Sequence, residues 1–352
     1  MKLFYLTGSN LNSMPANAVH TTNMTQAFLN IGCSVKYFVK EISDHHPEAL
    51  KWPSAIILLH ILMFKICNFN EDIFIHSRDR NKLAIMLALF GFTVGMEFHN
   101  LKIFGGFEAL VFRLLTQLGV VKLFFTSETL YNQFILTNFK GANLPFTKLE
   151  NAAPHSFIKQ RLVTPVLRKN LSFAMVSNKR TGKGQEKVEV LSRMYPDYNF
   201  TIVGPSLSGI EKTNNLDLIG KIQNKHVFPY LNAADILLAL IDKKMEVAGG
   251  RFEDGDLACP LKIFEYLALS KPIIMSKRRA MVELFSCLPG VWFVNDDLSN
   301  FEAIVNKIQN LDKVELKHIQ ASHKEFIRQL SWENRAVSVL GVLNGKNISS
   351  RV

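Results

Sequence analysis

The stretch that decides the fold runs from Pro260 to Ile274 and reads Pro-Leu-Lys-Ile-Phe-Glu-Tyr-Leu-Ala-Leu-Ser-Lys-Pro-Ile-Ile. Its apolar residues recur at helical spacing, at Leu261, Phe264, Leu267 and Ala268, which predicts a helix with one face toward a core. A proline opens the helix, where its missing N–H is not needed, and a Lys-Pro pair ends it before a strand-like Ile-Ile. The stretch therefore indicates a helix followed by a strand of an α/β domain.

Two charged residues lie near the start of this helix and on one face of it. Lys262 and Glu265 are three residues apart, which is the spacing of a surface ion pair on an ordinary helix. A helix N-terminus also attracts phosphate, so the lysine could meet a diphosphate and the glutamate could accept hydrogen bonds from ribose hydroxyls. Spacing alone leaves both interpretations open.

Size, composition and charge restrict the class of protein. The chain has 352 residues, of which 48% are hydrophobic and 20% charged, so we expect two globular α/β domains. The net charge of +11 divides into +3 for residues 1–155 and +8 for the rest. A basic protein can bind nucleic acid, an anionic membrane or a phosphorylated small molecule. Because the sequence contains no RNA-binding aromatic motif, zinc-finger spacing or basic zipper, we expect no nucleic-acid partner.

Cysteine usage and apolar runs bear on location. Cys33, Cys67, Cys259 and Cys287 form no metal-binding or CxxC pattern, which is typical of reduced thiols in the cytoplasm. The apolar start of the chain predicts a first strand rather than a signal peptide. The apolar run at residues 53–69 is too short to span a bilayer and predicts a buried or amphipathic helix. Its apolar face could alternatively touch a membrane surface.

In the first half of the chain, short apolar strands alternate with helices, as in parallel sheets. Polar residues follow two of the predicted strands. Arg78 and Asp79 come after the strand Ile73–Ile75, and His99 and Asn100 after Thr93–Phe98. Ligands of open α/β sheets gather at the carboxyl ends of strands, so both clusters are candidate site residues.

Among the histidines, His99 is the best candidate near a reacting group, and Glu97 shares its strand face and is predicted to orient it. The other histidines considered are predicted to be surface or capping residues: His20, His45, His46, His155 and His226.

The strand–helix pattern restarts after Asn151-Ala152-Ala153-Pro154-His155. We expect one domain at residues 1–154, joined by a C-terminal helix at about 331–352, and another at 155–330. The second domain opens with a strand at Ser172–Val176, a basic loop with two glycines, and a helix at Gln185–Met194. Glycines allow a phosphate to approach the backbone and basic side chains neutralise it. A solvated basic turn would give the same pattern.

Six segments in order resemble retaining glycosyltransferases with two Rossmann-like domains, the GT-B fold, in particular family 4 (group 1). In chain order the segments are Arg78-Asp79 with Glu97-Phe98-His99, Phe125-Thr126-Ser127, Asn151-Ala152-Ala153-Pro154, Gly220 with Tyr230–Ile236, Pro260–Ile274, and Ser331–Ala336; Lys183-Gly184 matches a further Lys-Gly pair of the family. The resemblance covers nearly the whole chain. It implies two parallel-sheet domains facing a central cleft, and a C-terminal helix that crosses back to the first domain.

The resemblance also implies roles for individual residues. In the family, the equivalent of Glu265 holds the ribose, and a basic residue with a Lys-Gly pair clamps the donor diphosphate. The basic residue here is either Lys179 or Arg180. The implied donor-binding residues are Lys179, Arg180, Lys183, Gly184, Asp256, Leu261, Lys262 and Glu265. His99 and Glu97 are the implied catalytic residues, and the implied acceptor-side residues are Arg78, Asp79 and Asn100.

One position departs from the family pattern. The first of two paired glutamates falls at Leu257, which cannot hydrogen-bond a sugar hydroxyl. Asp254 and Asp256 are close enough in sequence to substitute for it. Although these two aspartates have the spacing of a metal-binding DxD motif, the basic residues already neutralise a diphosphate. We therefore expect no metal ion and no cofactor.

The sequence thus predicts a retaining hexosyltransferase of the EC 2.4 class. It would use a nucleotide-diphosphate sugar and a glycan or lipid-linked acceptor, in bacterial surface-polysaccharide assembly. We expect a cytoplasmic protein that also binds the inner-membrane surface. Two alternatives stay open, namely a non-catalytic nucleotide-sugar or glycan-binding subunit, as Leu257 hints, and a sugar-nucleotide epimerase of the same architecture.

Overall fold

The computed structural model describes residues 2–11, 16–42, 49–68, 70–153, 170–178, 180–206, 208–223, 226–246 and 252–345. The chain forms two compact units, one of Met1–Glu150 with Ser331–Val352 and one of Asn151–Leu330. The boundary expected between Pro154 and His155 lies outside the described residues, and so do Lys179, His45 and His46. The predicted α/β class, with two parallel sheets, is confirmed.

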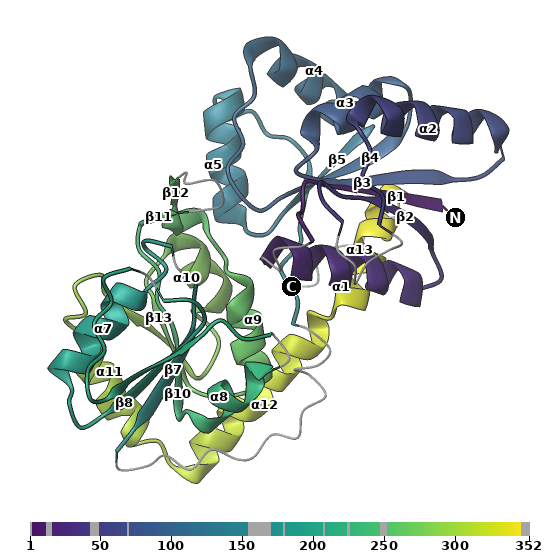
Figure 1. Ribbon diagram of the computed structural model, residues 1–352. Coiled ribbons are helices and arrows are strands. Elements are labelled where there is room, and N and C mark those ends of the chain that lie inside the picture. The colour runs from purple at the N-terminus through teal and green to yellow at the C-terminus, as the bar shows by residue number, and fades with distance from the viewer. Residues whose placement is uncertain are drawn as a thin grey trace. The chain divides into compact units, whose positions relative to one another are not determined.

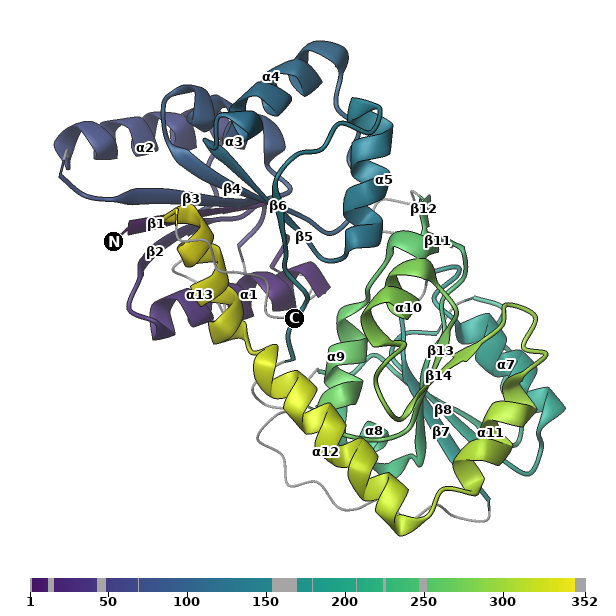
Figure 2. The same cartoon turned by 180° about the vertical axis from the view of Figure 1, so that it is seen from behind.

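The first unit is built around a six-stranded parallel sheet (Figure 1). In spatial order its strands are β2 (Ser34–Phe38), β1 (Lys2–Thr7), β3 (Ile73–Arg78), β4 (Thr93–Phe98), β5 (Val121–Phe125) and β6 (Phe146–Lys148). Its helices are α1 (Ala16–Asn30), α2 (Ser54–Cys67), α3 (Asn81–Leu89), α4 (Gly106–Gln117), α5 (Glu128–Phe139) and α13 (Trp332–Leu343). Helices α1 and α13 pack together on one face of the sheet, while α2, α3 and α4 lie side by side on the other (Figures 1 and 2).

The strand order of this sheet reverses between β1 and β3, and ligands of open α/β sheets bind at such reversals. Thr7 pairs with Arg78, and Arg78 pairs with Glu97, so the carboxyl ends of β1, β3 and β4 lie next to one another. Strand β3 extends beyond its predicted end at Ile75, because His76 and Arg78 belong to it and are buried. Polar residues in a sheet interior gave no pattern that distinguished them from a loop.

The second unit has a parallel sheet of its own, also with six strands. In spatial order these are β14 (Val291–Val294), β13 (Ile273–Ser276), β10 (Ile236–Ala239), β7 (Ser172–Val176), β8 (Asn199–Val203) and β9 (Leu216–Gly220). The helices are α7 (Gln185–Met194), α8 (Phe228–Ala233), α9 (Leu261–Ala268), α10 (Arg279–Phe285), α11 (Phe301–Gln309) and α12 (Lys313–Gln329). This is the strand order of dinucleotide-binding folds, with the reversal between β7 and β10.

Alternating side chains of these strands bury both faces of the second sheet. Phe173 lies in the core beneath α7 and α11, whereas Ala174 lies in the core formed with α8 and α9. The long segment Asp242–Cys259 is polar in sequence and has no strand pattern, which is typical of a loop. It instead contains a small antiparallel hairpin, β11 (Lys244–Glu246) with β12 (Phe252–Asp254), followed by the 3₁₀ turn η2 (Gly255–Leu257). Strands of three residues are too short for a period of two to be read from sequence.

Helix α9 ends at a residue with an unusual backbone conformation. Ser270 has φ of 55°, in the left-handed region, and its N–H donates to the carbonyl of Leu267 at 2.9 Å. Glycine adopts such φ values without steric cost, whereas residues with a Cβ do so rarely. The chain therefore holds a serine in a conformation that favours glycine.

We expect Ser270→Gly to raise the free energy of unfolding by about 0.5–1 kcal/mol, because it relieves this left-handed strain. Urea denaturation followed by circular dichroism measures the change. The matched control is Ser286→Gly at the C-cap of α10, where φ of −64° gives glycine no advantage and a small loss is expected. A destabilisation by Ser270→Gly as large as that of the control would contradict the prediction.

Candidate functional site

The loop between β7 and α7 approaches the backbone of β10 and β11 so closely that only glycine fits. Gly182 and Gly184 have φ of 73° and 92°. A Cβ at Gly182 would lie 2.4 Å from the carbonyl oxygen of Lys244, and one at Gly184 would lie 2.3 Å from that of Leu240. The carbonyl of Gly182 accepts a hydrogen bond from the amide of Asp242 at 3.0 Å. These contacts fix the residue between the two glycines at the point where the strand order reverses.

That residue is Lys183, whose ammonium group donates to the sulfur of Met245 at 3.1 Å. Burial and the nearby charge of Arg180 lower its pKa, although Glu253 and Glu246 oppose the shift. Arg180 itself is partly exposed at the edge of the loop. The loop therefore presents two basic side chains, Arg180 and Lys183. Burial and the neighbouring positive charge of Arg180 both favour the neutral form of Lys183.

Helix α9 places a second lysine beside the same strand end. Lys262 donates from its ammonium group to the carbonyl of Val176 at 3.1 Å, and the amide of Val176 donates to the hydroxyl of Tyr266 at 2.7 Å. The first turns of α9 are thereby joined to the last residue of β7. Burial and the charge of Lys183 lower the pKa of Lys262 to about 7, so the two lysines lie within electrostatic reach of each other.

Glu265 lies one turn further along α9 and is 7% exposed. Burial raises the pKa of its carboxyl group to about 7, against the opposing charge of Lys262. Two groups of opposite type that both titrate near neutrality are typical of functional sites. Of the residues predicted to bind a donor, Lys183, Gly184, Lys262 and Glu265 are thus brought together by β7, α7 and α9.

The remaining predicted donor-side residues have other surroundings. Leu261 is the partly buried first residue of α9, and Leu257 is buried in η2. Asp256 lies 3.5 Å from the Nε of Arg279 and 3.9 Å from a guanidinium nitrogen of Arg278, so its carboxylate already has basic partners. Sequence reasoning missed Arg278, which is buried and donates to the carbonyl of Ile241 and to Asp296. Arg278 stands in the basic run Lys277-Arg278-Arg279 after a strand, and such a run carries no motif that distinguishes the buried arginine from a solvated one.

In the first unit, four cationic or imidazole side chains surround the carboxylate of Glu97. We name this group the Glu97 cluster. Its carboxylate oxygens lie 3.1 Å from Nε2 of His20 and 2.8 Å from Nε2 of His76, and both His99 and Arg335 are also hydrogen-bonded to it. The prediction that His20 is a surface or capping residue is wrong, since its exposed fraction is 2%.

Arg335 reaches this carboxylate from α13, with 2.6 Å between its Nη2 and Oε1 of Glu97. The same guanidinium donates to the carbonyls of Leu149 and Glu150 at the end of the first segment of the unit. Although burial by itself would raise the pKa of Glu97, the charge of Arg335 and the imidazoles of His20 and His99 hold it well below its usual range. Glu97 is therefore a carboxylate at neutral pH.

Two histidines of this cluster, His99 and His20, are held neutral. Burial and the charge of Arg78 lower the pKa of His99 to about 4, although Glu97 acts in the opposite direction. The same causes lower the pKa of His20 well below its ordinary value. Because an ionised Glu97 only accepts hydrogen bonds, Nε2 of His99 carries the proton and its Nδ1 is left as an acceptor. The side chain of His99 is 14% exposed.

The other predicted acceptor-side residues lie at the ends of the same strands. Arg78 is buried in β3 and acts on the cluster through its charge. Asp79 has φ of 71° and forms an ion pair with Lys102 at 3.5 Å. Asn100 is partly buried just after β4. Ligand atoms of His20, Glu97 and His99 lie within 4.8 Å of one another, as in a metal site, but Arg335 occupies the same carboxylate with a fixed positive charge.

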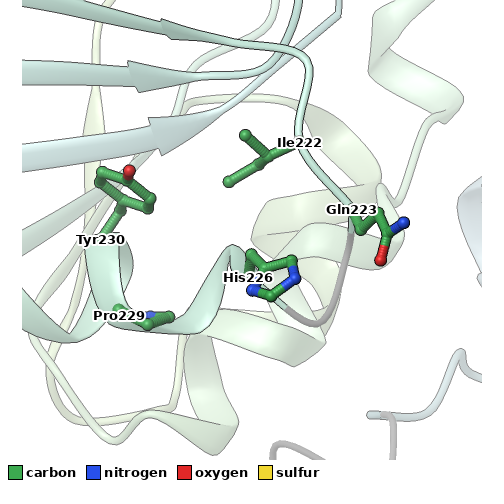
Figure 3. Close-up of a pocket in the computed structure, with 5 residues that line it drawn as sticks. All are labelled: Ile222, Gln223, His226, Pro229 and Tyr230. Carbon is green, nitrogen blue, oxygen red and sulfur yellow. The ribbon is translucent and has the colours of Figure 1, made fainter.

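A surface pocket of about 790 Å³ opens beyond the carboxyl end of β9 (Figure 3). It is lined by Ile222, Gln223, His226, Pro229 and Tyr230. Figure 3 shows the ring of Tyr230 and the side chain of Ile222 on one side of the hollow and the imidazole of His226 across from them. As predicted, His226 is exposed. The pocket and the Lys183 loop both follow strands of one sheet and lie at its carboxyl edge.

Lowering the pH should destabilise the first unit in two steps, and protonation of residues in the Glu97 cluster causes both. Because the folded pKa of His99 lies below 6.5, the unfolded chain binds more protons, and stability falls from about pH 6.5 to about pH 4. The depressed pKa of Glu97 adds a further loss below about pH 4.5. We expect His99→Gln to flatten the decline of the melting temperature between pH 6.5 and 4.5. A slope equal to that of the exposed-site control His226→Gln would refute this assignment.

Comparisons with known proteins agree with the expected resemblance. Residues 180–341, just under half of the chain, match the family described as glycosyl transferase-like. No curated protein has a sequence that matches. A glycosyltransferase from Rickettsia africae has a similar structure, with a TM-score of 0.75 and 15% identity over 99% of this chain and 100% of that one.

Two further structures show the same likeness. Anabaena HepE in complex with UDP gives a TM-score of 0.69 and 13% identity over 98% of this chain and 100% of that one. Sucrose-phosphate synthase from Thermosynechococcus elongatus gives a TM-score of 0.66 and 13% identity over 98% of this chain and 99% of that one. The chain therefore has the GT-B fold, as the sequence predicts, and residues 180–341 are similar to the glycosyl transferase-like family.

Proposed function

We propose that this protein is a glycosyltransferase of the EC 2.4 class that uses a nucleotide-diphosphate sugar as its donor. The observation that carries the proposal is the meeting of Lys183, Lys262 and Glu265 at the carboxyl end of β7. This is where the strand order of the second sheet reverses, and such points bind nucleotides in related architectures. The structural relative HepE, in complexes with UDP and with UDP-glucose, supports the choice of donor class.

The two lysines suit the chemistry of sugar transfer. As the bond between sugar and phosphate breaks, the leaving nucleoside diphosphate gains negative charge. Groups that are fixed before the reaction stabilise this charge better than water does, because they need no reorganisation. Since the pKa of Lys262 is about 7 in the free protein, arrival of a diphosphate favours its charged form and draws a proton from solvent.

The donor nucleotide would extend from these lysines along the carboxyl edge of the sheet. Strands are about 4.8 Å apart, and β8 separates β7 from β9, so the carboxyl ends of β7 and β9 lie about 10 Å apart. A nucleotide spans that distance. The pocket offers Tyr230 and His226, whose rings can stack on a base. We assign the base to this pocket and the ribose to Glu265.

In the first unit, we propose that His99 contacts the sugar and that Glu97 positions it. The Nδ1 of a neutral His99 is free to accept a hydrogen bond from a sugar hydroxyl, whereas Glu97 is wholly buried and acts only through its imidazole neighbours. Arg78, Asp79 and Asn100 form the proposed acceptor side. Retention at the anomeric carbon, without a metal ion or cofactor, is carried over from the family resemblance.

The finer parts of the proposal concern the biological setting. We propose a hexose donor, a glycan or lipid-linked acceptor, and a role in bacterial surface-polysaccharide synthesis at the cytoplasmic face of the membrane. A basic chain with an excess of +8 in its second part suits an anionic donor and an anionic membrane.

Thermal-shift measurements with UDP, GDP, ADP and CMP should identify one nucleotide that raises the melting temperature, since ligands that bind only the folded state stabilise it. Incubation with the corresponding nucleotide sugars should then release the free nucleotide slowly. Interconversion of two nucleotide sugars would instead indicate an epimerase, and binding without turnover would indicate a non-catalytic subunit. Either result would refute the transferase.

The same assay has a matched pair of variants. Lys262→Met should weaken diphosphate binding by about tenfold or more, because a charge-assisted contact to phosphate is lost. Lys307→Met removes an exposed lysine from α11 of the same unit and should leave binding unchanged. Isothermal titration calorimetry in buffers of different ionisation enthalpy should also detect proton uptake at pH 8 for the unmodified protein and less for Lys262→Met.

If Glu265 holds the ribose, the protein should discriminate against nucleotides that lack a ribose hydroxyl. We expect the unmodified protein to bind the 2′- or 3′-deoxy nucleotide at least about tenfold more weakly than the ribonucleotide. Glu265→Ala, which removes both acceptor oxygens, should bind both forms with similar, reduced affinity. Equal discrimination in Glu265→Ala and the unmodified protein, measured by calorimetry, would show that another residue holds the ribose.

A further inference from the structure

The face of the first unit that carries α2, α3 and α4 is apolar on its outer side as well as its inner side. Residues such as Ile57 and Ile61 of α2 turn inward and are fully buried. The helices lie side by side across one face of the sheet (Figures 1 and 2). A surface helix of a globular protein normally has a polar outer face. The outer side of these helices therefore serves some purpose other than the core.

Twelve of the twenty large hydrophobic side chains that are exposed within the described residues belong to these three helices and their ends. They are Ile56, Leu59, Met63, Ile66, Met86, Leu89, Phe90, Ile103, Phe107, Leu110, Leu114 and Leu118. We call them the apolar face. On α2 and on α4 they follow one another at intervals of three and four residues, so each helix presents one continuous apolar stripe. The most exposed of them, Phe107, is 80% accessible at the start of α4.

The charges on the three helices of the apolar face are mostly positive. Helices α2 and α3 contain no acidic residue, and α4 contains one, Glu108. Basic residues on these helices and just before α2 are Lys51, Lys65, Lys82 and Arg113, of which all but Lys65 are exposed. A protein partner that covered so many aliphatic side chains would be expected to meet a mixed polar rim. An apolar surface on helices whose charges are mainly basic complements the headgroups and acyl chains of an anionic bilayer.

We propose that the apolar face docks the first unit onto the surface of a membrane that contains anionic lipid. Aliphatic and aromatic side chains of α2, α3 and α4 enter the boundary between headgroups and acyl chains, and Lys82 and Arg113 contact the lipid phosphates. Within the described part of the chain, the helices are all too short or too polar to cross a bilayer. This inference concerns a surface distinct from the donor site, and it stands or falls independently of the donor chemistry.

Vesicle flotation tests the inference directly. We expect the full chain to float with phosphatidylcholine vesicles that contain phosphatidylglycerol, and to float less as salt is raised, because screening weakens the basic contacts. The double variant Leu59→Glu with Leu114→Glu should lose flotation, since each substitution places a carboxylate in the apolar boundary. The matched control is Val190→Glu with Val314→Glu, two exposed valines of α7 and α12 in the second unit, which should float like the unmodified protein.

A second pair of variants keeps the test decisive if the glutamate variant unfolds. Lys82→Gln with Arg113→Gln leaves the apolar side chains in place and should weaken binding about fivefold for each charge removed. The inference is overturned if the unmodified protein stays unbound, or if the control loses flotation as fully as the glutamate variant. It is also overturned if light scattering finds a dimer that Leu59→Glu dissociates and neither form floats. Loss of flotation with unchanged nucleotide binding would leave the proposed function intact.

Discussion

A single buried carboxylate holds the first unit together. Glu97 has no exposed surface, yet it is ionised because Arg335 and the imidazoles of His20 and His99 surround it. Leaving such a charge without its partner costs about 3–5 kcal/mol, whereas replacing the whole cluster with apolar groups would cost far less. The interaction therefore specifies one arrangement of α1, β3, β4 and α13 rather than simply adding stability.

Both units place polar groups where the strand order of their sheet reverses, but the ionisation of those groups differs between the units. Each sheet reverses its strand order once, and each reversal gathers the candidate residues at the carboxyl ends of strands. In the first unit, Arg335 balances the charge of Glu97, and Glu97 stays ionised near neutral pH. In the second, Lys262 and Glu265 are both buried enough to have pKa values of about 7, so small changes nearby alter their protonation. The first arrangement suits orientation, and the second suits the arrival of a charged ligand.

Sequence reasoning predicted the second unit best, because its signals are local. The bounds of β7 and α7 follow from a strand pattern, two glycines and an amphipathic helix, and the structure has them where predicted. The sequence also predicted that Lys262 and Glu265 share one face of a helix, because they are three residues apart. The GT-B architecture followed from six short segments in a fixed order, each of which is weak alone.

The Glu97 cluster could be predicted only in part, because its members are far apart in the chain. His20 lies on a helix without any local sign of a buried partner, and His76 lies inside a strand that the sequence analysis ended too early. Arg335 was recognised as part of a C-terminal helix, but a contact with Glu97 depends on tertiary packing that no periodicity encodes. The hairpin within residues 242–259 was missed for a different reason, since its strands are shorter than the period that reveals them.

Because α13 completes the first unit from a distant part of the chain, the residues of that unit are not synthesised together. The second unit is one continuous segment, whereas the first is completed by Ser331–Val352 at the end of the chain. A ribosome therefore exposes the six strands of the first sheet long before it supplies the guanidinium that neutralises their buried carboxylate. Domains generally fold as they emerge, the N-terminal one first. Here the first unit is interrupted by the second and receives its last residues only after the second unit has been synthesised, so a fragment ending at Glu150 would lack the piece that closes it.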